Sequence, residues 1–205
     1  MAFKWWAVKL AAVCIVVFVL QALFPFITEG FALVSADLLA RPWILLTHIF
    51  LHGSMEHLLY NMFALALFGS ILEKIISSKR FLVLFFISGL FAGIGSAIFY
   101  PASIGASGAI FGVLGCLTIL RPRMTVWVGM VPMPLAVAAF VWAAGDLIGM
   151  FAPGQIANAA HLFGLGFGLI VGLKMRKRFG EIKIKGSKSE ISDTQFKQWE
   201  DEWMK

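Results

Sequence analysis

The sequence predicts an all-α, polytopic membrane protein: a bundle of six transmembrane helices with a short fourth helix and re-entrant outer loops. Three observations lead to this fold class. Apolar side chains make up 60% of the 205 residues and charged ones only 14%, too few to cover a soluble domain of this size. The apolar residues fall into six runs, separated by short breaks that contain polar residues, proline or glycine. Most Lys and Arg residues flank one side of the expected bundle.

Each of the six apolar runs is expected to form a helix. The first run follows Lys4 and Lys9 like the core of a signal peptide, but it lacks a small-residue cleavage site, so we expect a retained first span. The six runs cover residues 5–26, 58–72, 81–99, 107–120, 124–145 and 156–173. Together they predict a membrane-embedded domain at residues 1–179. Residues 180–205 are expected to be a short cytoplasmic tail, either helical or disordered.

The positions of Lys and Arg predict the orientation of the bundle. Arg41 alone lies on the opposite side from the other basic residues, so we expect both termini in the cytoplasm and the protein in the plasma or inner membrane. The basic residues of the cytoplasmic side are Lys4, Lys9, Lys74, Lys79, Arg80, Arg121, Arg123, Lys174, Arg176, Lys177 and Arg178. The formal charge of +6 therefore indicates contact with the lipid bilayer, not with nucleic acid.

Two irregular segments are expected on the outer side. Residues 28–51 mix apolar and charged side chains and are expected to lie in the membrane interface. The fourth run spans roughly 21 Å at about 1.5 Å per residue, whereas the hydrocarbon core is about 30 Å thick. Because Arg121 and Arg123 hold its far end in the cytoplasm, Ser107 must lie below the outer surface. Residues 100–105 are then irregular backbone at membrane depth, which predicts a water-filled cavity ending at Ser107.

Three further polar side chains are expected at the depth of Ser107. His161 lies about five residues, or roughly 7–8 Å, inside the sixth run. His57 lies at the mouth of the second run, and Asn61 lies one turn deeper on the same face. His57 and Asn61 taken singly are equally well explained as hydrogen-bonding links between helices. An ionisable group within a span, such as His161, is more often functional.

Glycine spacing predicts that the fourth and sixth helices approach closely. Gly164 and Gly168 share one stripe with His161, and Gly108 lies beside Ser107. Small residues four positions apart allow two helix backbones to come together. A serine hydroxyl and an imidazole can share a hydrogen bond only if their helices nearly touch.

The sequence Gly105-Ala106-Ser107-Gly108 opens the fourth run. It places the serine hydroxyl and its amide N–H at the positive end of a helix, a suitable place for an oxyanion, and the two glycines free the backbone there. This four-residue match is weak by itself, because most serines in membrane helices pack or bond back to the preceding turn. With a neutral His161 nearby, the serine would have an acceptor for its proton.

Other reactive residues have simpler interpretations. His48 and His52 are four apart, but the glutamate of a HExxH zinc site is missing, so we expect them to order the outer loop through hydrogen bonds. Glu73 is expected to be an ion-pair or capping residue. Asp146 is expected to be a solvated or capping acid, and neither acid is expected to be a third catalytic residue.

Cysteine usage predicts neither a disulfide framework nor a structural zinc site. Cys14 and Cys116 both lie inside apolar runs and lack CxxC spacing. We therefore expect no metal and no cofactor.

The polar residues described above follow one order along the chain. They are His48, His52, His57 and Asn61, then Gly105-Ala106-Ser107-Gly108, then Ala160-His161 with Gly164 and Gly168. This pattern, over about residues 43–173, resembles the rhomboid family of intramembrane serine proteases. The resemblance implies a six-helix core and hydrolysis of peptide bonds in or near transmembrane segments of membrane proteins, by a Ser/His dyad without an acid. It implies Ser107 as nucleophile and His161 as base, and His57, Asn61 and the Ser107 amide as oxyanion-binding groups.

Two departures from the family pattern stand beside this resemblance. The outer loop reads Arg41-Pro42-Trp43-Ile44, where many relatives carry adjacent Trp and Arg. Phe111 stands where some relatives have a tyrosine under the catalytic histidine; its ring face is still expected to support the imidazole. An alternative function is that of a catalytically inactive rhomboid-like protein that binds membrane proteins. Such a protein would be expected to have lost the serine, the histidine or the glycines.

Overall fold

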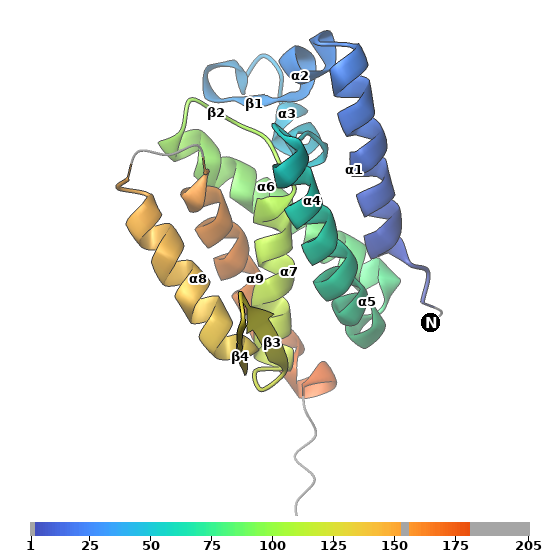
Figure 1. Ribbon diagram of the computed structural model, residues 1–205, viewed down its shortest axis with the longest axis vertical. Coiled ribbons are helices and arrows are strands. Elements are labelled where there is room, and N and C mark those ends of the chain that lie inside the picture. Colours follow the sequence, from blue (N-terminus) through green and yellow to red (C-terminus); the bar gives the residue numbers. More distant parts are fainter. Residues whose placement is uncertain (1–2, 153–155, 181–205) are drawn as a thin grey trace, which may run out of the picture.

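The computed structural model describes residues 3–152 and 156–180, so the expected tail lies almost entirely outside the described residues. Its helices run side by side, with a short β-pair at each end (Figure 1). The elements are α1 (Trp6–Leu23), α2 (Phe26–Phe31), β1 (Leu33–Val34), η1 (Ser35–Asp37), α3 (Ile44–Thr47), η2 (His48–Phe50), α4 (Met55–Ala64), η3 (Leu65–Gly69), α5 (Ser70–Ile76), α6 (Ser78–Phe99), β2 (Ala102–Ser103), α7 (Ser107–Leu120), β3 (Thr125–Val128), β4 (Val131–Pro134), α8 (Leu135–Gly149) and α9 (Asn158–Phe179).

Within the described ranges, four helical stretches are long and apolar enough to cross a membrane. They are Trp6–Leu23, Met55–Ile76, Ser78–Phe99 and Asn158–Phe179. The second stretch runs through α4, the π-helical turn η3 and α5. The apolar helices α7 and α8 have only 14 and 15 residues. At about 1.5 Å per residue, neither reaches across a hydrocarbon core about 30 Å thick, so the expected six crossings stay a prediction.

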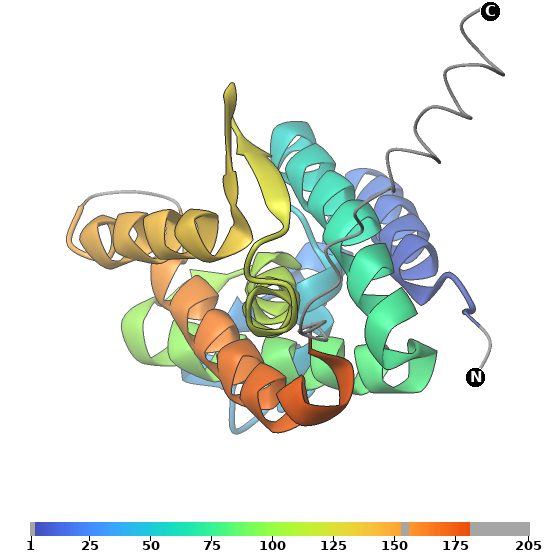
Figure 2. The same cartoon turned by 90° about the horizontal axis from the view of Figure 1, so that it is seen from below.

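Helix α7 lies at the centre of the bundle. Seen from below, it points along the line of sight with the other helices around it (Figure 2). Its largest interfaces are with α9 and α6, whereas α8 lies at the edge of the bundle. Nearly every residue of α7 is buried, because its sequence is entirely uncharged and three glycines after Ser107 leave room for neighbouring backbones. The residue that opens α7 is therefore held on a rigid central element.

The fifth apolar run is not one helix from residue 124, as the sequence suggested. Its first half is a β-hairpin in which β3 pairs antiparallel with β4. Gly129 has a φ of 61°, which suits the first position of a two-residue type II′ hairpin turn. Pro132 and Pro134 lack the N–H that a helix interior needs. Helix α8 therefore begins only at Leu135.

Residues 28–51 form an outer layer of short elements. Strand β1 pairs antiparallel with β2, so this layer is hydrogen-bonded to the chain just before α7. The Ser96 hydroxyl of α6 also donates to the Ser103 hydroxyl at 2.6 Å. In the same layer, Arg41 donates to the Glu29 carbonyl at 2.7 Å and pairs with Asp37. The segment that leads to Ser107 is thus fixed by two independent sets of hydrogen bonds.

The opposite end of the bundle is tied together by Glu73. This fully buried carboxylate accepts hydrogen bonds from the backbone N–H groups of Lys4 at 3.3 Å and Ala7 at 3.1 Å, and from the Ser78 hydroxyl at 2.5 Å. It therefore caps the positive start of α1, as its capping interpretation requires. The start of α1, the α5–α6 junction and the last turns of α7 and α9 all lie at this end (Figure 1). The predicted basic side is thus one end of the molecule, although its orientation in a membrane stays a prediction.

Candidate active site

Ser107 and His161 are in hydrogen-bonding contact. Ser107 is the first residue of α7 and His161 lies in the first turn of α9. The Ser107 hydroxyl and Nε2 of His161 are 2.8 Å apart, although the two residues are 54 positions apart in the chain. Ser107 and His161 are both partly buried. A hydroxyl directed at an imidazole nitrogen is the arrangement that allows general-base activation of a serine.

Glycines bring these two helices into backbone contact. A Cβ on Gly164 would lie 2.0 Å from the carbonyl oxygen of Gly108, and one on Gly168 would lie 1.9 Å from that of Gly112. Both distances are far below van der Waals contact, so no larger residue fits without moving a helix. The glycine stripes singled out in the sequence therefore face each other, one turn apart, directly beneath the Ser107–His161 contact.

Gly105 shapes the turn that precedes Ser107. Its φ of 128° is a conformation that residues with a side chain rarely adopt. Its N–H donates to the His48 carbonyl at 2.9 Å. A Cβ at this position would lie 2.7 Å from the His57 ring. Gly105 thus allows the outer layer, the start of α4 and the start of α7 to meet at one point.

Phe111 supports the imidazole from one side. Its ring is stacked on that of His161, with centroids 4.3 Å apart and an angle of 4° between the planes. The expected apolar ring face is therefore present one turn after Ser107 on the same helix. It restricts rotation of the imidazole.

His57 and Asn61 lie on α4, next to this region, but the structure shows no hydrogen bond from either side chain to Ser107. The Asn61 amide donates to the His57 carbonyl of its own helix at 3.0 Å. The His57 N–H is capped by the Ser54 hydroxyl at 3.1 Å. His57 packs against Gly105, and its ring is 5.1 Å from that of His52. Their expected role toward an oxyanion stays a prediction.

His48 and His52 are buried in the outer layer. Nδ1 of His48 lies 3.0 Å from the Ile44 carbonyl, and the His52 backbone N–H donates to the Gln21 side chain at 3.0 Å. Burial lowers the pKa of His48 to about 4. Burial, and secondarily the neighbouring His57, lowers the pKa of His52 to about 4. Both are thus neutral at physiological pH, and within the described residues no group of three His, Cys, Asp or Glu side chains could hold a metal ion.

Asp146 is not the solvated or capping acid that the sequence suggested. It lies in the last turn of α8, and its Oδ1 is 3.0 Å from Nδ1 of His161. Its side chain is only 10% exposed and that of His161 only 12% exposed. The buried residues of α8, Leu135, Ala138, Ala139 and Asp146, share one face at helical spacing, so an ionisable residue on an apolar helical stripe was the signal that could have revealed this contact.

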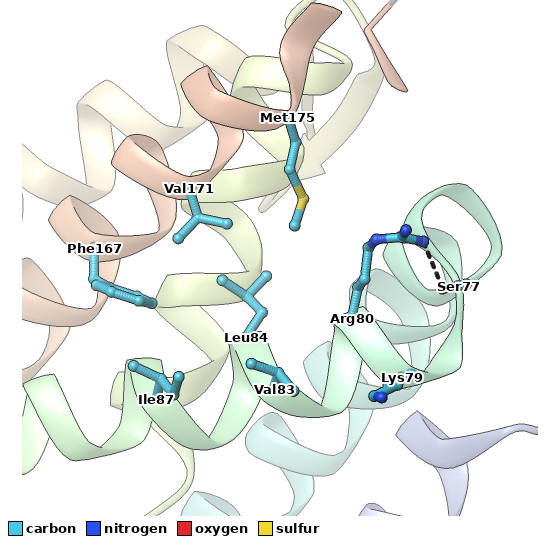
Figure 3. A pocket seen from close by; sticks show the side chains of 9 residues that line it. All are labelled: Ser77, Lys79, Arg80, Val83, Leu84, Ile87, Phe167, Val171 and Met175. Atoms are coloured by element: carbon cyan, nitrogen blue, oxygen red, sulfur yellow. Dashed lines mark hydrogen bonds between the residues drawn. The ribbon is translucent and has the colours of Figure 1, made fainter. Parts of the chain in front are cut away.

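A hollow away from Ser107 lies among the helices. It has a volume of about 470 Å³ and is lined by side chains of α6 and α9 (Figure 3). Its walls are apolar, with Lys79 and Arg80 at one end. The expected water-filled cavity at Ser107 stays a prediction.

Known proteins are similar to this chain over much of its length. The Rhomboid domain matches residues 39–178, more than half of the chain. The rhomboid family protein YdcA of Bacillus subtilis (strain 168) is 32% identical over 132 residues, which cover 63% of this chain and 65% of YdcA. Rhomboid protease GlpG of Yersinia pseudotuberculosis serotype I is 32% identical over 133 residues, covering 63% of this chain and 46% of GlpG.

The matched region spans less than two thirds of each of these relatives. The Rhomboid domain match at residues 39–178 includes Ser107, His161 and the glycines between their helices. Together with the four apolar helices, the domain match indicates a multi-pass membrane protein. The chain belongs to the rhomboid family.

Proposed function

We propose that this protein is an intramembrane serine protease that hydrolyses peptide bonds in or near transmembrane segments of other membrane proteins. The observation that carries the proposal is the 2.8 Å contact between the Ser107 hydroxyl and Nε2 of His161. This contact joins the start of α7 to the apolar helix α9 inside the bundle. A transmembrane substrate would reach the serine from the surrounding membrane. The similarity to a relative named rhomboid protease supports the same activity.

In the proposed reaction, Ser107 is the nucleophile and His161 the general base. Nε2 of His161 accepts the hydroxyl proton while Oγ attacks the scissile carbonyl, and the imidazolium then gives that proton to the leaving amine. This leaves an acyl ester on Ser107. Water, deprotonated by the same imidazole, hydrolyses the ester and restores the serine.

The oxyanion of each tetrahedral intermediate needs hydrogen-bond donors. The first N–H groups of a helix have no partner within it, and no side chain caps the start of α7. We propose that the Ser107 amide supplies one donor and that the side chains of His57 and Asn61 supply others. Asn61 uses one of its two amide hydrogens on the His57 carbonyl, so the other would serve the oxyanion.

The proposal extends to topology and substrate. Six crossings, with α7 and α8 in a locally thinned or shielded part of the bundle, would place both termini in the cytoplasm and Ser107 in the outer half of the membrane. A transmembrane segment must expose its backbone before it is cut, because a helix hides its peptide bonds. We expect small side chains at the cut site, since glycine, alanine and serine surround the nucleophile. No cofactor enters this chemistry.

Cleavage of a model transmembrane substrate by the purified protein tests the proposal. Ser107→Ala and His161→Ala should each abolish turnover and labelling by a fluorophosphonate probe, and the double variant should be no worse, because the two residues act as one unit. Ser70→Ala is a matched control, since this serine lies on α5 near the opposite end and should leave both signals unchanged. Each variant is compared at equal folded fraction.

Two outcomes would contradict the assignment. Turnover by Ser107→Ala protein would exclude this serine as nucleophile. A folded wild-type protein that neither labels nor cleaves, but still binds transmembrane segments, would favour the catalytically inactive alternative.

A further inference from the structure

The contact between Asp146 and His161 lies outside a two-residue mechanism. Nδ1 of His161 faces Oδ1 of Asp146 at 3.0 Å, while Nε2 faces the Ser107 hydroxyl at 2.8 Å. The imidazole thus joins a serine on α7 to a carboxylate on α8. Serine, histidine and aspartate are connected in line, each on a different helix.

Burying this carboxylate is costly. An ionised acid in a low-dielectric interior needs several hydrogen-bond donors to replace water. Within the described residues, Oδ2 of Asp146 has no hydrogen-bond partner, and Oδ1 is bonded to Nδ1 of His161. A purely structural acid would not be expected with so few donors, so its retention on the buried face of α8 calls for another role.

The position of Asp146 is set by α8. Its buried residues Leu135, Ala138 and Ala139 lie on the same helical face and pack inward at the other end of this short helix. Small alanines let α8 approach the bundle, and the last turn then delivers Asp146 to the first turn of α9. The contact is therefore produced by helix packing and not by a mobile surface side chain.

We propose that Asp146 is a positioning residue for His161, which gives the site a Ser-His-Asp arrangement instead of a dyad. Its carboxylate accepts the Nδ1–H of His161, which leaves the Nε2 lone pair directed at the Ser107 hydroxyl. When the serine proton moves to Nε2, the carboxylate stabilises the imidazolium without taking a proton itself. The proton then goes to the leaving amine. This inference rests on the proposed function of Ser107 and His161.

Other groups around the imidazole do not replace this role. Phe111 covers one ring face but accepts no N–H. His57 on α4 packs against Gly105, beside the start of α7, and an imidazole carries no negative charge. Among the described residues, Asp146 is thus the acid that orients His161.

Kinetics of Asp146→Asn test the proposal, because this change keeps the shape of the side chain and removes its charge. We expect kcat per active-site-titrated enzyme to fall by about 10–10³-fold with KM nearly unchanged, less than the roughly 10⁴-fold loss known for the equivalent change in a soluble serine protease. The melting temperature in detergent should stay equal or rise, since a poorly satisfied buried charge is removed. Asp146→Glu should recover part of the lost kcat.

Asp37→Asn is the matched control, because Asp37 is an acid of the outer layer paired with Arg41. It should leave kcat unchanged.

Wild-type kcat in Asp146→Asn, with a lowered melting temperature, would overturn the positioning role and make Asp146 structural. If Ser107→Ala abolishes turnover in the same assay, the proposed protease survives that result; if Ser107→Ala stays active, the proposed function itself fails. Should Asp146→Asn not fold, Asp146→Glu with unchanged kcat and KM would equally contradict the inference.

Discussion

Glu73 and Asp146 are both acids buried in the bundle, and they differ in how their oxygens are satisfied. Glu73 accepts from two backbone N–H groups and a serine hydroxyl. Asp146 accepts from His161, while its second oxygen has no partner within the described residues. A carboxylate with several fixed donors stabilises the fold, whereas one that depends on a single imidazole contributes little to it. We therefore expect changes at the Glu73 end to affect mainly stability and changes at the Asp146 end to affect mainly the proposed catalysis.

Glu73→Ala should have the largest effect on stability. It leaves two backbone N–H groups at the start of α1 and the Ser78 hydroxyl without this acceptor, which we expect to cost about 3–5 kcal/mol of the free energy of unfolding. The kcat of the folded fraction should be unchanged, because Glu73 lies at the opposite end of the bundle. The unfolding midpoint in mild detergent and kcat per titrated enzyme measure the two effects. Glu73→Gln is the milder control, since its amide oxygen still accepts one bond.

If Glu73→Ala instead lost its kcat while its stability stayed at the wild-type level, Glu73 would serve catalysis and the prediction would be wrong.

His161→Ala should have an intermediate effect on stability, through Asp146. Removing the imidazole leaves a buried carboxylate without its one donor, at an expected cost of about 1–3 kcal/mol. The double variant His161→Ala/Asp146→Asn should then be more stable than His161→Ala alone, because the unpaired charge is gone. Chemical unfolding of the three proteins measures this coupling. Equal stability of the single and double variants would show that water already satisfies Asp146.

The Ser107–His161 contact could be predicted from the sequence, whereas the contact of Asp146 with His161 was missed. Ser107 and His161 could be placed together because their depth and the glycine spacing can be read directly from residue positions within each apolar run. Asp146 was missed, although it shares an apolar stripe with Leu135, Ala138 and Ala139, because the apolar residues before Leu135 were assigned to the same helix. The turn at Gly129 and the prolines that follow it delay the start of α8 to Leu135.

Strand signals are hard to recognise inside a membrane protein. Residues 125–134 are as apolar as a span, so composition alone assigned them to a helix. The alternation of side chains and the Pro-containing second strand were the available signals, but they extend over only four residues in each strand. The capping role of Glu73 was easier to anticipate, since an acid at the end of an apolar run is usually paired or capping.

Phe111→Leu should have the smallest effect and would sharpen the account of the Asp146 end. Leucine fills much of the ring volume but offers no flat face to the imidazole, whose ring now stacks on Phe111 at 4.3 Å. An aromatic pair is worth about 0.5–1.5 kcal/mol beyond its buried area, which corresponds to a loss of about 2–10-fold in kcat if the stack holds His161 in its reactive orientation. Phe111→Tyr keeps the face and is the matched control, with kcat expected within about twofold of wild type.

The combination of Phe111→Leu with Asp146→Asn decides whether ring face and carboxylate restrain the same motion. If both hold one imidazole, either restraint partly compensates for loss of the other, and the double variant should lose more kcat than the product of the single losses. In that variant the Ser107 hydroxyl would be the remaining polar contact of the ring. Simple multiplication of the two losses would instead mean that Asp146 acts through its charge alone and Phe111 through packing alone. Fluorophosphonate labelling rates, measured beside kcat, make the same distinction without a peptide substrate.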